Sequence, residues 1–203
     1  MLERVERNDL YMQNEPDIAN IWRELLEANK YHREFRLKFL FQFLYVSQNW
    51  KEPLKQDSSA VLELIHKSLS NPREMRDAVE LIEFFGTQCQ IALIDDLINM
   101  VVRYDEPQEG GDIARKIISS LPKEWLEANF RLAVGCWLQR DDAYKFEPSL
   151  LGLCAEIDPN LAQEFAEEAL KSSDEGDQEV GQWILEDYLP KQQRKGLEKG
   201  NVK

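Results

Sequence analysis

The chain has 203 residues, 43% of them hydrophobic and 31% charged, so it can bury a core large enough to fold without disulfides or metals. Its formal net charge of −13 repels phosphate backbones and anionic lipid head groups, which argues against nucleic-acid and membrane partners and favours a basic protein. No uncharged stretch approaches the roughly 20 residues that span a bilayer.

Helical periodicity runs along nearly the whole chain, because apolar residues recur at three- and four-residue spacing. The predicted helices lie near residues 15–30, 31–48, 58–70, 72–86, 89–104, 111–120, 123–139, 143–157, 159–172 and 177–189. No alternating run of β-branched residues bounded by turn dipeptides indicates a strand. The sequence therefore predicts an all-α protein.

The most apolar segment runs from Phe39 to Val46 and is apolar almost all round, so it must be covered on several sides. We expect Phe39→Ala or Phe43→Ala to cost at least about 3 kcal/mol of stability. Trp50 follows in a polar turn and is the tryptophan most expected to be exposed.

Helix boundaries are indicated by proline, asparagine, aspartate and glycine. Asn71-Pro72-Arg73-Glu74 is typical of a helix start, with Asn71 as cap and Glu74 reaching back to it. Gly86 lies where a helix C-terminus favours a left-handed residue. Asp158-Pro159 repeats the start signal, and Pro148 shortens or kinks the helix predicted over 143–157.

Two apolar stripes in the second half of the chain are expected to face the core. The first consists of Leu126, Phe130, Ala133, Val134 and Trp137, and the second of Val180, Trp183, Ile184 and Tyr188. Trp125, Trp137 and Trp183 are therefore predicted to be core residues.

The helices are read as one domain over residues 1–190, followed by a basic, disordered tail over 191–203. The helix–acidic turn–helix segment from Asp158 to Leu189 resembles a unit of the HEAT and armadillo class of repeats. That resemblance implies antiparallel helix pairs stacked as a short α-solenoid with a curved binding surface. The alternative fold is an irregular helical bundle, since the start signals at Pro72, Pro122 and Pro159 are unevenly spaced.

Catalytic and cofactor signatures are weak. Glu63-Leu64-Ile65-His66 has the Glu-x-x-His spacing of di-iron bundles, but the second copy that such a site needs is missing. Neither nucleotide-binding glycine motif occurs. Adjacent acidic residues point about 100° apart on a helix, so they make no facing acid–base pair. We therefore expect no catalytic residue, no metal and no cofactor, and a chain that is not an enzyme.

Three cysteines, Cys89, Cys136 and Cys154, lie in apolar helical contexts without C-x-x-C spacing. Reduced, packed thiols are expected, which suits a cytoplasmic protein. The first nine residues are mostly charged and are not typical of a secretory signal.

A small basic cluster lies early in the chain and consists of Lys30, Arg33, Arg36 and Lys38. It is read as a solvated helix face. Some helical-repeat DNA glycosylases share the expected architecture, but they need a basic concave surface, and the acidic balance of this chain departs from that.

Negative charge is densest between Glu156 and Asp187, where eleven acidic residues accompany one lysine, Lys171. Such clustering steers oppositely charged partners, so we expect a surface that binds a basic protein. The expected contact residues are Glu164, Glu167, Glu168, Asp174, Glu175, Asp177, Glu179 and, as an aromatic anchor, Trp50. The simpler alternative is a solubilising end cap.

The leading hypothesis is a non-enzymatic interaction protein, for example an inhibitor or immunity-type protein that neutralises a basic toxin or enzyme. One alternative is an enzyme or ligand-handling protein with a pocket between helices, as in helical-repeat proteins that bind tetrapyrrole-like cofactors. Another is self-assembly through the apolar N-terminal helices.

Overall fold

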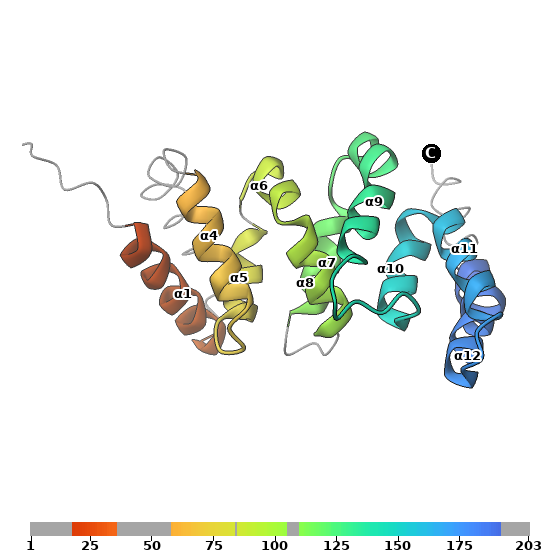
Figure 1. Cartoon of the computed structure of the whole chain (residues 1–203). Coiled ribbons are helices and arrows are strands. Elements are labelled where there is room, and N and C mark those ends of the chain that lie inside the picture. The colour runs from red at the N-terminus through yellow and green to blue at the C-terminus, as the bar shows by residue number, and fades with distance from the viewer. Residues whose placement is uncertain (1–17, 36–57, 84, 105–109, 192–203) are drawn as a thin grey trace, which may run out of the picture. The chain divides into compact units, whose positions relative to one another are not determined.

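The computed structural model describes residues 18–35, 58–83, 85–104 and 110–191 (Figure 1). Within these ranges the regular elements are helices and there is no strand, which confirms the all-α prediction. The chain groups into two compact units, residues 1–67 and 68–203. The single domain over 1–190 stays a prediction.

The described part of unit 1 holds helix α1 (Ile18–Phe35) and most of α4 (Ser58–Leu69). The helix α1 continues past residue 30, so the predicted boundary between 30 and 31 is wrong. The buried apolar side chains that these two helices contribute to unit 1 are Trp22, Leu25, Leu26, Val61 and Ile65. The apolar segment 39–46 and Trp50 lie outside the described residues.

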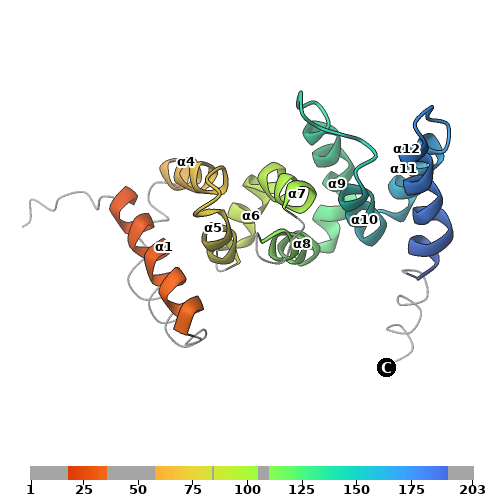
Figure 2. The same ribbon diagram turned by 90° about the horizontal axis from the view of Figure 1, so that it is seen from below.

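Unit 2 is a series of short helices, of which Figure 2 gives a second view. They are α5 (Met75–Ile82), α6 (Thr87–Ala92), α7 (Ile94–Arg103), α8 (Gly111–Ser119), α9 (Lys123–Trp137), α10 (Pro148–Ile157), α11 (Pro159–Ala169), α12 (Glu175–Trp183) and a π-helical turn, η1 (Ile184–Tyr188). Neighbours in sequence pack together, as α7 does on α8 and α11 on α12. Helices further apart in sequence also touch, as α7 does α9 and α10.

The core of unit 2 comes from the inner faces of these helices. Its fully buried side chains include Ile82, Leu93, Leu97, Ile98, Ile117, Ile118, Phe130, Trp137 and Leu150. Burying each large apolar side chain stabilises the fold by about 1.5–3 kcal/mol, so these inner faces hold the helices in place.

Several helix boundaries differ from the predicted ones. The helix α5 begins at Met75, and Glu74 accepts hydrogen bonds from the side chains of Asn71 (2.9 Å) and Ser68 (2.8 Å) rather than closing a capping box. Gly86 is extended (φ −67°) and precedes α6, so its predicted left-handed cap is wrong. Leu93 interrupts the helix predicted over 89–104.

The predicted start at Asp158-Pro159 is confirmed. Asp158 accepts a hydrogen bond from the backbone N–H of Leu161 at 3.1 Å, and Pro159 occupies the first turn of α11. Pro148 likewise occupies the first turn of α10, so this helix begins five residues later than the predicted 143. Both prolines use a position where the missing N–H costs no helical hydrogen bond.

Candidate functional site

The predicted acidic surface is built on α11 and α12. Along α11 the apolar positions Leu161, Ala162, Phe165, Ala166 and Ala169 are buried. The intervening residues Glu164, Glu167 and Glu168 are therefore exposed on the opposite side, as the helical period requires.

Two of these α11 carboxylates are held by basic residues of the same chain. Arg131 on α9 contacts Glu164 at 2.8 Å and Asp158 at 3.3 Å, and the hydrogen bond to Glu164 raises the pKa of Arg131. Lys145 pairs with Glu168 and lies 4.6 Å from the centre of the Phe165 ring. Glu167 is exposed and accepts a hydrogen bond from Gln163 at 2.8 Å.

The two aspartates before and within α12 shape the fold. Asp174 caps α12 and accepts the backbone N–H of Gly176 at 2.8 Å. Asp177 is only 8% exposed and accepts hydrogen bonds from Ser172 Oγ (2.5 Å) and from the Tyr144 hydroxyl. The bond to Asp177 raises the pKa of Tyr144 to about 12. Asp177 therefore contributes no exposed carboxylate to the predicted surface.

The outer side of α12 carries the remaining acidic residues. Glu175 and Glu179 are exposed, one turn apart, and form no ion pair with another described residue. Like charges at this spacing destabilise a helix by a few tenths of a kcal/mol, about the amount an opposite pair would stabilise it. Glu186, in the following turn η1, is also exposed and accepts hydrogen bonds from Gln182 at 3.2 Å.

An aromatic side chain lies on the same side. Trp183 is 39% exposed, and its ring centre lies 5.0 Å from that of Tyr188. It follows Glu179 by four residues, which is one turn of helix. The prediction of Trp183 as a core residue is wrong, whereas Trp137 is buried as predicted. We call Glu175, Glu179, Trp183 and Glu186 the α12 face.

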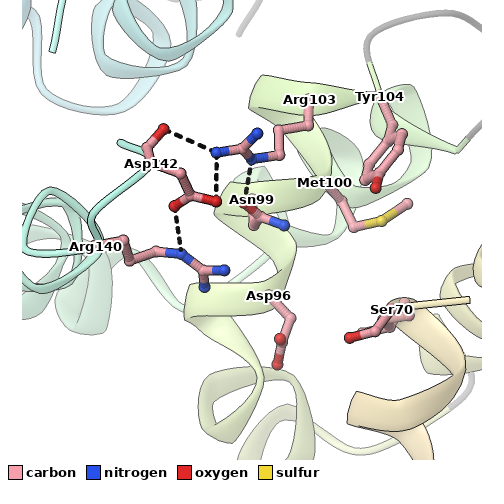
Figure 3. Close-up of a pocket in the computed structure, with 9 residues that line it drawn as sticks. Ser70, Asp96, Asn99, Met100, Arg103, Tyr104, Arg140 and Asp142 are labelled. Carbon is pink, nitrogen blue, oxygen red and sulfur yellow. Dashed lines mark hydrogen bonds and ion pairs between the residues drawn. The ribbon is translucent and has the colours of Figure 1, made fainter. Parts of the chain in front are cut away.

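A polar pocket of about 250 Å³ lies elsewhere in unit 2 (Figure 3). One wall holds Asp142, whose Oδ2 is 2.7 Å from Arg103 Nη2 and whose Oδ1 is 3.5 Å from Arg140 Nε. The Arg103 Nη2 group also donates to the main-chain oxygen of Asp142 at 2.8 Å, and its Nε donates to Asn99 at 3.1 Å. Asp96 and Ser70 line the opposite wall.

This pocket is too small and too polar for a large flat cofactor. Ligand pockets for such molecules are mostly apolar and run from roughly 300 to 1,000 Å³. Here both guanidinium groups pair with the single carboxylate of Asp142. These ion pairs connect α7 to the loop after α9. The pocket therefore does not support the alternative of a tetrapyrrole-binding protein.

Metal-ligating and nucleophilic groups do not converge in the described ranges. No group of three His, Cys, Asp or Glu side chains that could hold a metal ion occurs among those residues. Glu63 and His66 are both exposed on α4. Burial raises the pKa of Cys89 to about 11 and that of Cys154 to about 12, which disfavours their thiolates. Cys136 is exposed, so its predicted packing is wrong.

Of the basic cluster predicted as a solvated face, Lys30 is exposed, and the side chains of Arg33, Arg36 and Lys38 lie outside what the structure describes. In the described helices, no segment combines the length and apolar character needed to cross a bilayer.

Three comparisons with known proteins, against family models, curated proteins and solved structures, each gave no match. The function of the chain therefore has to be inferred from the geometry of the α12 face.

Proposed function

We propose that unit 2 is a short α-solenoid of antiparallel helix pairs that serves as a protein-binding module. Contacts of α7 with α8, of α9 with α10 and of α11 with α12 support three such pairs. Contacts between alternate helices, α7 with α9 and α8 with α10, support stacking of one pair on the next.

The module binds a basic protein partner through the α12 face and performs no reaction of its own. The observation that carries this proposal is the pair Glu175 and Glu179, exposed and without ion pairs in the described chain, beside the exposed ring of Trp183. Such carboxylates need break no internal contact when a lysine or arginine approaches.

The chemistry of this face fits a cationic segment. An indole ring attracts a guanidinium or ammonium group by about 0.5–2 kcal/mol, and tryptophan is enriched at binding hot spots. The net charge of −13 adds long-range attraction that raises the association rate. An inhibitor or immunity-type protein that neutralises a basic toxin or enzyme needs such a high association rate.

The α11 carboxylates contribute less. Glu164 and Glu168 already pair with Arg131 and Lys145, so a partner would have to displace those contacts. The contact set that we propose is therefore Glu167, Glu175, Glu179, Trp183 and Glu186.

The test is affinity capture from a lysate at about 50 and about 300 mM NaCl, followed by mass spectrometry, because screening lengths shorten over this range. We expect a basic partner whose capture falls as salt rises. Glu179→Lys should reduce capture roughly tenfold, and Trp183→Ala by a similar factor.

The matched control is Glu63→Lys, since Glu63 is an exposed mid-helix glutamate on α4 and its reversal changes the net charge equally. This variant should capture the partner nearly as well as the wild type. Equal loss in both variants would show that total charge matters and the α12 face does not. Capture indifferent to salt and to both reversals would contradict the proposal.

A further inference from the structure

The indole ring of Trp183, the exposed aromatic group of the α12 face, lies against a second ring across the π-helical turn. The turn η1 spans Ile184–Tyr188, and a π-helix aligns residues five apart, whereas an α-helix places them about 140° apart. Tyr188 accordingly contacts Trp183, with the ring centres 5.0 Å apart and the ring planes inclined by 55°. Such turns are rare in proteins and occur frequently at functional sites.

Tyr188 is itself anchored to the body of unit 2. Its hydroxyl donates a hydrogen bond to Glu156 on α10 at 2.8 Å, and Glu156 also pairs with Arg115 on α8 at 3.2 Å. The indole of Trp183 therefore rests on a side chain that two other helices hold in place. A ring that is already fixed loses less conformational freedom when a partner binds to it, which favours tight binding.

The neighbouring helix α11 shows what a ring and a carboxylate one turn apart can bind. Phe165 and Glu168 are three residues apart on α11. The Nζ atom of Lys145 lies 4.6 Å from the centre of the Phe165 ring, and the same ammonium group pairs with Glu168. The chain thus already holds one cation by a cation–π contact together with an ion pair.

The α12 face repeats this combination of groups. Glu179 and Trp183 are four residues apart on α12, so their Cβ atoms lie about 5–6 Å apart on one side of the helix. Among the residues that the structure describes, no basic side chain lies over the Trp183 ring or forms an ion pair with Glu179. The ring and the carboxylate therefore face solvent, where a cation of another molecule can reach both.

The exposure of the ring decides which cation fits best. Phe165 is 7% exposed and Trp183 is 39% exposed, so a cation on Trp183 stays in contact with water. An ammonium group is a compact and strongly hydrated charge, whereas a guanidinium group is weakly hydrated and stacks flat on an aromatic ring. The N–H groups in its plane remain available for a carboxylate. A guanidinium can therefore stack on Trp183 and pair with Glu179 at the same time.

We propose that Trp183 and Glu179 form a subsite that selects an arginine side chain over a lysine side chain. This inference rests on the proposed capture of a basic partner and names the side chain by which the α12 face holds it. Trp183 provides the stacking surface and Glu179 accepts the N–H groups of the guanidinium. Tyr188 is a positioning residue that fixes the indole.

Two synthetic peptides test this selection without the natural partner. One carries arginines and the other carries lysines at the same positions among glycines and serines, so their charges are equal. Isothermal titration calorimetry with the full chain, at constant ionic strength, should show that the arginine peptide binds roughly fivefold more tightly. Trp183→Leu should bind the two peptides equally, because its acidic surface still attracts both.

Matched amide variants separate the carboxylate of Glu179 from the total charge. Glu179→Gln should weaken binding of the arginine peptide more than binding of the lysine peptide, because the paired acceptor is lost. Glu63→Gln removes the same charge from another exposed mid-helix position, on α4, and should leave the arginine preference unchanged. Circular dichroism of each variant checks that the helices remain folded.

Equal binding of the two peptides by the wild type would overturn the proposal, as would binding of neither peptide. An arginine preference that survives Trp183→Leu would overturn it as well. If capture of the natural partner requires Glu179 and Trp183 while the peptides bind equally, the proposed function stands and the arginine selection alone is wrong. If the wild type prefers the arginine peptide and capture does not require these residues, the subsite stands and the proposed function is wrong.

Discussion

The helices α9 and α12 each bury one side and expose another, and the two exposed sides differ in kind. On α9 the inner side holds Phe130, Val134 and Trp137, and the outer side includes the exposed apolar side chain of Leu132. On α12 the inner side includes Gly181 against α11, and the outer side carries glutamates beside Trp183. Core packing sets the inner sides, so each outer side is free to carry its own binding chemistry.

The largest difference in stability is expected between truncations of one buried and one exposed residue of α9. Phe130→Ala should cost about 3–5 kcal/mol of unfolding free energy, because it leaves a cavity in the core. Leu132→Ala should change stability by no more than about 0.5 kcal/mol, because the side chain is exposed. Urea unfolding at low protein concentration measures both, and similar losses would show that Leu132 is a core residue.

Periodicity alone predicted the inner side of α9 but could not predict its outer side. Phe130, Val134 and Trp137 are buried as their spacing indicated. Cys136 lies in the same apolar run as Leu132, and that run predicts a packed thiol, although a pattern of apolar residues does not say whether the cover comes from the same chain. Only the structure shows which apolar residues of α9 are exposed.

The residues of α12 show two further limits of the sequence. Asp177 is indistinguishable from Glu179 by charge count, and its hydrogen-bond partner Tyr144 lies 33 residues away in sequence. Trp183 lies at the edge of its apolar stripe, just before the π-helical turn, and is 39% exposed. Leu93 interrupts a continuous apolar pattern, so that break had no sequence signal.

Alanine substitution of the two helical glycines should have opposite effects on stability. Gly181→Ala should destabilise the fold by about 1–3 kcal/mol, because the new methyl group would overlap the backbone of α11. Gly135→Ala should stabilise the monomer by about 0.5–1 kcal/mol through its better helix propensity. Thermal unfolding at low concentration distinguishes them, and a destabilising Gly135→Ala would mean that this glycine has an internal role.

A smaller effect of pH should come from the buried side of α12. Because the pKa of Tyr144 rises from 10.0 to about 12 in the fold, the unfolded chain loses this proton first as pH rises. The stabilisation is complete below the unfolded value and is lost between it and about pH 12.

The measurement compares wild type with Tyr144→Phe by urea unfolding at several alkaline pH values. The difference in unfolding free energy between the two should be constant up to about pH 9 and should shrink above it. The thiols of Cys89 and Cys154 titrate in both proteins, so their contribution cancels. A pH-independent difference would show that the hydroxyl of Tyr144 makes no such bond.

The smallest change concerns thiol reactivity and leaves stability untouched. Cys136 on α9 should react with a thiol reagent in the native protein, because it is exposed. Cys154 should react only on unfolding, because it is buried and its pKa is raised to about 12. Mass spectrometry of the labelled peptides identifies each site, and early labelling of Cys154 would contradict its burial.

The most direct test of whether the partner binds α12 and not α9 is amide hydrogen exchange. It is measured with and without the captured partner at one fixed chain concentration. We predict that the partner slows exchange along α12, from Glu175 to Trp183, and leaves α9, from Lys123 to Trp137, unchanged. Slowed exchange in α9 with no change in α12 would contradict the assignment of partner capture to the acidic face.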